Sequence, residues 1–288
     1  MIEYIRNKNL NELSTFRIGG PADRFIEPES VEMLIDVIGD LKAHSERFLV
    51  IGNGSNLLFS DEGYRGTIVK VGKGLDKVEC CSQFVTAGSG ALLSSVAKNA
   101  AKCGLTGLEF ACGIPGSIGG GVFMNAGAYD GQLSDCIHEV YSISPSGEKI
   151  CRAASACDFS YRHSVYMENE EIIFAVNFFL ENGKVEAIEE KISELTEKRV
   201  SKQPLQYPSA GSFFKRPEGY FAGKLIEDAG LKGFSVGGAQ VSEQHAGFVI
   251  NKGGATYQNV IDLMHYVQDK VFEQFGVKLE PEVRIIGS

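Results

Sequence analysis

Three short motifs are candidates for chemistry, because each sets charged or hydroxyl side chains among aromatic, glycine or proline residues. The first is FSYRHS at residues 159–164, in which Arg162 follows Tyr161. An arginine beside aromatic and hydroxyl groups suits a planar anion such as a carboxylate or phosphate. Taken alone, the motif is more typical of an ordinary surface arginine in a loop.

The second motif is YPSAGSFFKRP at residues 207–217. Ser212 follows a turn of small residues and precedes two aromatic residues, so its hydroxyl could face a dry cavity. The nucleophile pattern of α/β-hydrolases, G-x-S-x-G, is absent. Lys215 and Arg216 are close enough in the chain to bind a diphosphate, and a solvated basic pair is the alternative.

The third motif is LEPEVR at residues 279–284. In an alternating strand Glu282 and Arg284 share one face. They then form either a surface ion pair or an acid placed against a substrate. The five histidines of the chain follow no metal-ligand spacing, so no metal site is expected.

Two glycine-rich segments point to a bound cofactor. Residues 107–130 contain seven glycines among apolar residues, and Ser117 is placed to cap a short helix there. Buried glycines let a flat or anionic group approach the backbone, and exposed amides before a helix bind phosphate. The alternative is a tightly wound structural turn inside a large core.

The second segment is GNGSN at residues 52–56, directly after a buried strand at 48–51. A strand that ends in glycine, asparagine and serine supplies backbone donors for a phosphate. It is not the dinucleotide fingerprint, because the third glycine of G-x-G-x-x-G is missing, and no Gly-Lys-Ser/Thr of a P-loop follows.

Composition narrows the class of protein. The 288 residues are 43% hydrophobic and 23% charged, as in an ordinary globular chain. A net charge of −9 without a basic cluster makes nucleic acid a poor partner. The seven cysteines follow no C-x-x-C spacing and are expected to be reduced thiols of a cytoplasmic protein. We expect neither an export signal nor a membrane span.

The elements that must position these residues are mixed along the chain. Periodicity predicts helices at 31–41, 91–103, 185–200, 221–229 and 257–275, the first with Ser30 at its N-cap. Strands are expected at 48–51, 67–71, 84–87, 136–144, 148–152, 171–180, 239–242, 246–250 and 279–286. Because the alternation is irregular, the pattern favours an α+β fold over a doubly wound parallel sheet.

Together the motifs are specific for one family. TFRIGGPA, IGNGSNLL, GLEFACGIPGSIGGGVFMNAGAY, FSYRHS, YPSAGSFFK and LEPEVRIIG occur in this order across nearly the whole chain. The sequence closely resembles the UDP-N-acetylenolpyruvoylglucosamine reductase (MurB) family of bacterial peptidoglycan synthesis. The resemblance implies an FAD-binding fold of the vanillyl-alcohol oxidase/MurB type. Two FAD-binding lobes, expected at 1–66 and 67–198, precede a C-terminal α+β substrate-binding domain at 199–288.

The resemblance also implies an activity and the residues that carry it. The family reduces UDP-N-acetylglucosamine enolpyruvate to UDP-N-acetylmuramate with NADPH and FAD, and we expect the FAD to be non-covalent. The catalytic positions match Arg162, Ser212 and Glu282. Substrate contacts are expected at Tyr161, Arg199, Lys215 and Arg216. FAD contacts are expected at Gly52, Asn53, Gly54, Ser55, Asn56, Cys112, Gly113, Ile114, Pro115, Gly116, Ser117, Gly119, Gly121, Asn125 and Gly127.

One departure concerns the substrate lid. Some family members carry an inserted loop with a tyrosine that folds over the substrate, and no such insertion occurs between Tyr161 and Pro204. The chain therefore resembles the shorter subtype. Two other interpretations are an FAD oxidase of the same fold and a nucleotide-binding module without turnover. The motifs outside the flavin segments argue against the first, and intact Arg162, Ser212 and Glu282 argue against the second.

Overall fold

The chain divides into two compact units in a computed structural model that describes residues 2–287. The first unit comprises residues 2–5, 25–53 and 66–199, and the second comprises 6–24, 54–65 and 200–287. Each unit is therefore assembled from separate stretches of sequence. The two FAD-binding lobes and the C-terminal domain predicted from the sequence are defined by their function. The two units are defined by packing, so they do not test that prediction.

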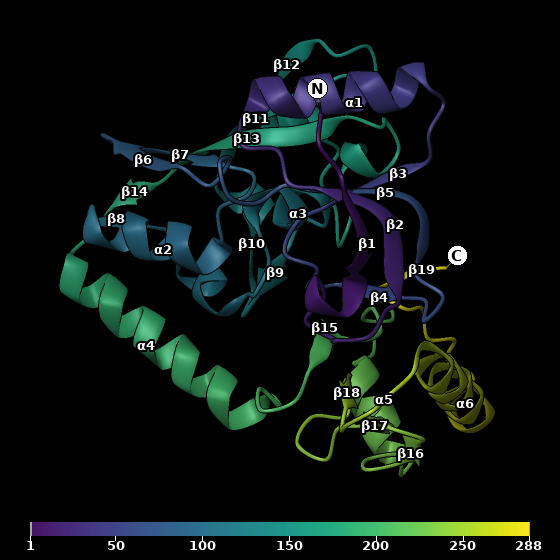
Figure 1. Cartoon of the computed structure of the whole chain (residues 1–288). Helices are drawn as coiled ribbons and strands as arrows, with labels where there is room; N and C mark the ends of the chain where they lie inside the picture. The colour runs from purple at the N-terminus through teal and green to yellow at the C-terminus, as the bar shows by residue number, and fades with distance from the viewer. Residues whose placement is uncertain (1, 288) are drawn as a thin grey trace. The chain divides into compact units, whose positions relative to one another are not determined.

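The first unit, drawn in Figure 1, contains an antiparallel sheet with the strand order β12-β11-β13-β7-β6. Its helices are α1 (Val31–Ala43), α2 (Leu93–Lys102), α3 (Ile118–Phe123) and α4 (Val185–Lys202), of which α4 ends in the second unit. Its strands are β3 (Phe48–Ile51), β6 (Val78–Cys81), β7 (Phe84–Gly88), β8 (Leu105–Thr106), β9 (Gly127–Ala128), β10 (Gly131–Gln132), β11 (Ile137–Ile143), β12 (Lys149–Ala153), β13 (Ile172–Phe179) and β14 (Glu181–Asn182).

The second unit contains the antiparallel sheet β15-β18-β17-β16 and a parallel pair, β4 with β19. Its elements are β4 (Leu57–Phe59), β15 (Ser209–Ser212), α5 (Ala222–Asp228), β16 (Ser235–Val236), β17 (Ala239–Val241), β18 (Phe248–Asn251), α6 (Tyr257–Phe275) and β19 (Arg284–Ile286). Three further strands have residues in both units, namely β1 (Ile5–Asn9), β2 (Pro21–Ile26) and β5 (Tyr64–Lys70).

Helix ends follow local sequence signals. Ser30 caps α1 by accepting a hydrogen bond from the amide of Met33 at 3.1 Å, as predicted. Thr256 and Asn259 form a capping box at the start of α6, and Gly276 ends that helix with a left-handed φ of 68°.

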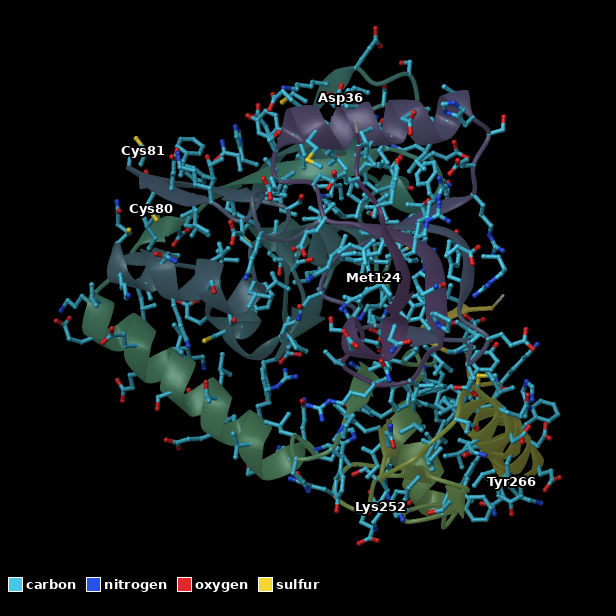
Figure 2. All side chains as sticks on the ribbon, viewed as in Figure 1. Asp36, Cys80, Cys81, Met124, Lys252 and Tyr266 are labelled. Carbon is cyan, nitrogen blue, oxygen red and sulfur yellow. The ribbon has the colours of Figure 1, made fainter. Side chains whose placement is uncertain are left out.

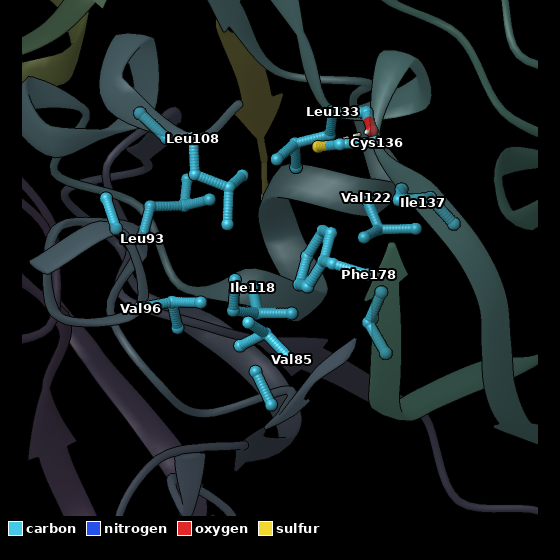
Figure 3. Packing of buried hydrophobic residues seen from close by; sticks show 14 of the residues in the cluster. Val85, Leu93, Val96, Leu108, Ile118, Val122, Leu133, Cys136, Ile137 and Phe178 are labelled. Carbon is cyan, nitrogen blue, oxygen red and sulfur yellow. Dashed lines mark hydrogen bonds between the residues drawn. The ribbon is translucent and has the colours of Figure 1, made fainter. Parts of the chain in front are cut away.

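A buried apolar cluster holds the glycine-rich segment in the first unit. Figure 3 shows Ile118 and Val122 of α3 packed with Val85 and Phe178 of the sheet and with Leu93 of α2. All five side chains are almost completely buried. Because α3 carries part of the predicted cofactor segment, this core fixes that segment against the sheet.

One predicted strand is wrong in part. The strand expected at 279–286 is reduced to β19, and Glu282 lies outside it, next to a bend at Val283. Pro281 has no amide hydrogen for a ladder and makes only an isolated bridge to Phe214. The proposed shared face of Glu282 and Arg284 on a regular strand is therefore not observed.

Candidate functional site

The two glycine-rich segments meet in the first unit. The side-chain amide of Asn53 donates a hydrogen bond to the carbonyl oxygen of Pro115 at 2.6 Å. A Cβ placed on Gly52 would lie only 2.1 Å from Ser117 Oγ, so the two backbones are in direct contact. Segments that were separate in the sequence therefore form one surface, and Gly52 is needed for their approach.

The glycines of the longer segment pack closely against the protein itself. A Cβ on Gly113 would lie 2.7 Å from Cδ of Arg199, and one on Gly119 would lie 2.9 Å from Cβ of Ser89. Gly121 faces Leu133 at 2.9 Å, and Gly127 faces the carbonyl of Gly131 at 2.5 Å in the same way. Tight internal packing is thus one physical reason for these glycines. Gly120 differs, because its Cβ would meet nothing closer than 3.7 Å.

The start of α3 differs from the anion site that the sequence predicts. Ser117 occupies the N-cap position, but its side chain makes no capping hydrogen bond. The amides of Ile118 and Gly119 donate to the carbonyls of Ala91 and Ser89, both at 2.8 Å. These two amides are therefore not available to a phosphate, and any anion must use other donors.

Two buried hydroxyls border the same loops. Within residues 2–287, neither Ser117 Oγ nor Ser89 Oγ has a hydrogen-bond partner, although both serines are about 2% exposed or less. Unsatisfied buried hydroxyls are uncommon in proteins. Together with the side chain of Asn53 and the open face of Gly120, they provide polar groups suited to a cofactor that carries phosphates and a polar ring system.

Arg162 lies at the tip of a tight turn in the same unit. Ser160 and His163 pair across this turn, and Arg162 has a left-handed φ of 55°. Its guanidinium donates to the carbonyl of Gly127 at 3.1 Å and to that of Asn125 at 3.4 Å. The ring of Tyr161 lies 5.0 Å from its central carbon. The catalytic candidate is thus oriented by two residues of the glycine-rich segment.

Asn125 is the centre of this arrangement. It is completely buried and has a left-handed φ of 41°. Its side-chain amide donates to the carbonyl of Ser160 at 3.0 Å, and its side-chain oxygen accepts from the amide of Ser134 at 3.0 Å. Asn125 therefore joins the glycine-rich segment to the turn that carries Arg162.

Ser212 and Glu282 come together in the second unit. The amide of Glu282 donates to the carbonyl of Phe213 at 2.8 Å, and the amide of Lys215 donates to the carbonyl of Glu280 at 2.8 Å. These bonds hold the motifs at 207–217 and 279–284 side by side. Ser212 is exposed, whereas Glu282 is half-buried.

The basic residues of this motif have their own contacts. Lys215 Nζ lies 3.7 Å from a carboxylate oxygen of Glu280. The guanidinium of Arg216 stacks on the exposed ring of Phe221, with 3.8 Å from its central carbon to the ring centroid. This cation–π contact holds the guanidinium beside the ring.

From the sequence, Asn56 is expected to contact FAD and Thr15 has no assigned role, and neither is expected to hold these segments. The side chain of Asn56 donates to the carbonyl of Glu282 at 3.1 Å, and its carbonyl accepts from the amide of Arg284 at 3.0 Å. The hydroxyl of Thr15 donates to the carbonyl of Ser209 at 2.7 Å. Both lie in the second unit, and their motifs, TFRIGGPA and IGNGSNLL, were the only signal in the sequence.

The remaining predicted residues lie on the same loops or beside them. Cys112 is partly buried and follows Ala111 in the short 3-10 helix η2 (Glu109–Gly113). Arg199 lies near the end of α4, and burial lowers the pKa of its guanidinium. Gly54 contacts the carbonyl of Leu13 in the second unit, which a Cβ would approach to 1.8 Å. Ser55, Ile114 and Gly116 lie within the two glycine-rich segments.

The candidate site residues are divided between the two units. Arg162, Tyr161 and the loops at 52–53 and 113–127 belong to the first unit, and Ser212 and Glu282 belong to the second. Among the described residues, no cluster of histidine, cysteine or acidic side chains could hold a metal ion. No helix within residues 2–287 is both long and apolar enough to span a membrane.

Comparisons with known proteins bear on the family and the fold. Residues 203–286 match a family model described as the C-terminal domain of UDP-N-acetylenolpyruvoylglucosamine reductase, and residues 22–151 match a model of an FAD-binding domain. A reductase of that name from Clostridium botulinum (strain Alaska E43) is 50% identical over 98% of this chain and 92% of its own length. One from Agathobacter rectalis is 48% identical over 98% of this chain and 94% of its own.

A solved structure shows the same fold. The crystal structure of UDP-N-acetylenolpyruvylglucosamine reductase (MurB) from Thermus caldophilus has a TM-score of 0.85 and 32% identity, and the match covers 99% of each chain. The predicted FAD-binding fold with a C-terminal α+β domain is thereby confirmed. The chain belongs to the UDP-N-acetylenolpyruvoylglucosamine reductase family of FAD-dependent oxidoreductases.

Proposed function

We propose that this protein reduces UDP-N-acetylglucosamine enolpyruvate to UDP-N-acetylmuramate, with NADPH as donor and non-covalent FAD as carrier. The observation that carries this proposal is the extent of the family match, which includes residues 203–286 as well as the FAD-binding segment. An FAD oxidase of another specificity would match only in the FAD-binding segment. The product is a precursor of the bacterial cell wall, and we propose that the reaction takes place in the cytoplasm.

The glycine-rich loops fit the cofactor that the family uses. Gly52 and Asn53, with the loop at 113–117, would hold FAD through backbone contacts and the side chain of Asn53. Asn125 and Gly127 would lie at the end of this surface nearest Arg162. The cofactor held there would supply hydride transfer between NADPH and the terminal methylene of the enolpyruvyl group.

Arg162 would stabilise the charge that this addition creates. Negative charge develops on the carbon next to the substrate carboxylate and spreads into that carboxylate. A guanidinium there binds the transition state more strongly than the ground state. Removing one such preoriented donor costs roughly 3–4 kcal/mol in comparable sites. The carbonyls of Asn125 and Gly127 support this role because they fix the guanidinium before substrate binds.

Ser212 would then give a proton to the same carbon. The enolate carbon is strongly basic, so a serine hydroxyl is acidic enough to protonate it. General acid catalysis of this kind contributes about 10²–10⁴-fold. Glu282 would assist from the neighbouring segment. The hydrogen bond from its backbone amide to the carbonyl of Phe213 holds that segment beside Ser212. Lys215, Arg216, Tyr161 and Arg199 are the proposed contacts to the sugar nucleotide.

An anaerobic half-reaction tests the proposal. Ser212→Ala should let NADPH bleach the flavin at the normal rate, whereas reoxidation by the enolpyruvyl substrate should slow by about 10²–10⁴-fold. Stopped-flow absorbance of the flavin separates the two steps. The matched control is Ser209→Ala on the same strand β15, which should leave both rates unchanged. Normal reoxidation of the Ser212 variant would remove that serine as the acid.

The wild-type protein provides the test of the activity itself. Reduced protein should be reoxidised by UDP-N-acetylglucosamine enolpyruvate in the absence of oxygen. An oxidase of the same fold would ignore the sugar nucleotide and respond to oxygen instead. Flavin that stays in the pellet after acid precipitation would contradict non-covalent binding.

A further inference from the structure

Two cysteines of the first unit lie together away from the predicted site. Cys80 belongs to β6, where it pairs with Val85 of β7, and Cys103 is the C-cap residue of α2. Helix α2 packs against β6. The Cys103 thiol is also one cause, after burial, of the raised pKa of the Cys80 thiol.

A shared acceptor fixes this neighbourhood. The carbonyl oxygen of Asn99 accepts the Cys80 thiol at 3.9 Å and also the backbone amide of Cys103 at 3.1 Å. Figure 2 shows Cys80 on the side of β6 that faces α2 and Cys81 on the opposite side. The strand register therefore directs Cys80, and not its neighbour Cys81, toward the end of the helix.

We propose that Cys80 and Cys103 are a reversible dithiol–disulfide site that a hydroperoxide oxidises. The thiolate of Cys103 attacks the peroxide, the O–O bond breaks, and the sulfur becomes a sulfenic acid as hydroxide or water leaves. The sulfur of Cys80 then attacks that of Cys103, an S–S bond forms, and the sulfenic oxygen leaves as water. With hydrogen peroxide, two thiols and one peroxide give one disulfide and two waters, and a dithiol reductant reverses the change.

The order of the two steps follows from exposure. Cys103 is exposed and reaches a peroxide directly, whereas Cys80 is partly buried. Burial is the main cause, and the neighbouring Cys103 thiol a second cause, that raises the pKa of the Cys80 thiol to about 11. Cys80 is therefore a poor first nucleophile. We therefore expect Cys103 to react first.

The disulfide would tie the β6–β7 hairpin to one end of α2. At its other end, α2 contacts the predicted cofactor segment, where the amide of Leu93 donates to the carbonyl of Gly116 at 3.0 Å. Oxidation would therefore fix the far end of a helix that supports this segment. The proposal itself does not depend on the reaction that the protein catalyses.

Peptide mapping of the full-length protein tests the proposal. Brief treatment with hydrogen peroxide, followed by alkylation and digestion, should yield a peptide pair joined through Cys80 and Cys103. A dithiol added before alkylation should abolish this pair. Cys81→Ser, one residue along the same strand, is the matched control and should leave its yield unchanged.

A second variant distinguishes the mechanism from simple surface oxidation. In Cys80→Ser the sulfenic acid on Cys103 has no partner, so labelling by a 1,3-diketone trap should rise severalfold over the wild type. Equal labelling in both proteins, or a linkage that joins Cys81 or Cys151 instead of Cys80, would overturn the proposal. Protein that yields only sulfinic acid on Cys103 would overturn it as well.

Discussion

At the scale of single residues, the structure explains why an asparagine stands at position 125. A left-handed backbone suits asparagine better than most residues, and its short side chain reaches both Ser160 and Ser134. The resemblance placed Asn125 among the cofactor contacts, and that contact stays a prediction. What the hydrogen bonds add is a positioning role for the turn that carries Arg162, which no local pattern in the sequence indicates.

His163, beside Arg162, gives this turn a pH dependence. Its ring bonds to the carboxylate of Glu168 at 3.1 Å and to the carbonyl of Asp158 at 3.1 Å, and these bonds raise its pKa. Because the pKa of His163 is higher in the folded protein than in the unfolded chain, protonation of its ring stabilises the fold. This stabilisation is complete below about pH 6.5 and is lost as the pH rises through the pKa of the folded state. The pair is partly exposed to water, so its effect is small.

Thermal unfolding of His163→Gln measures this contribution. We expect a Tm deficit of about 1–3 °C at about pH 5.5 and a smaller deficit at about pH 8.5, since exposed ion pairs contribute at most about 1 kcal/mol. Glu168→Gln is the partner variant and should show the same trend. A deficit that is equal at both pH values would mean that the ion pair does not stabilise the turn.

At the scale of elements, local patterns predicted helices better than strands. Apolar periodicity indicated α1 and α6 within a few residues of their ends, with Ser30 as the predicted cap of α1. The short strands β4 and β15 were missed, and β19 was overextended, because their pairing depends on partners far away in the chain. Asn56 illustrates the same difficulty, because its hydrogen bonds to the segment at 282–284 join residues that are far apart in the sequence.

The contact between Gly52 and Ser117 can be tested by paired substitutions. Gly52→Ala should weaken FAD binding by about 5- to 100-fold, because overpacking of this kind costs about 1–3 kcal/mol. The measurement is the flavin retained on dilution, followed by absorbance. Adding Ser117→Gly to Gly52→Ala should restore most of the loss, since the next atom from the new Cβ is 3.9 Å away.

A glycine without neighbours provides the control for this pair. Gly39 in α1 has no atom within 4 Å of an added Cβ, so Gly39→Ala should leave FAD binding unchanged. Normal flavin retention in Gly52→Ala, or failure of Ser117→Gly to restore it, would show that the two loops do not need this close approach to bind the cofactor.

At the scale of the whole molecule, net charge opposes the proposed substrates. The chain carries −9, and both NADPH and the sugar nucleotide are anions, so a few local cations must overcome a repulsive field. Lys215 and Arg216 are the proposed pair. In Lys215→Gln/Arg216→Gln, raising ionic strength from about 20 to about 200 mM should raise kcat/KM about twofold or more, because screening then removes mainly repulsion.

In the wild-type protein, kcat/KM should fall as ionic strength rises, because salt also screens the local attraction by Lys215 and Arg216. Lys98→Gln/Lys278→Gln removes the same total charge from two exposed sites and is the matched control. It should retain the wild-type salt trend in steady-state kinetics. If this control reverses the trend as well, the effect belongs to net charge and not to the two residues near Ser212.

The parallel pairing of β19 with β4 has a consequence for how the protein is made. Arg284 pairs with Leu57, so β4 stays without this neighbour until β19, which lies far along the sequence, has left the ribosome. Contacts between such distant segments form slowly and leave an exposed strand edge in the meantime. A nascent chain of this protein therefore holds an incomplete second unit until β19 has been synthesised, and shielding by a chaperone would be most useful during that interval.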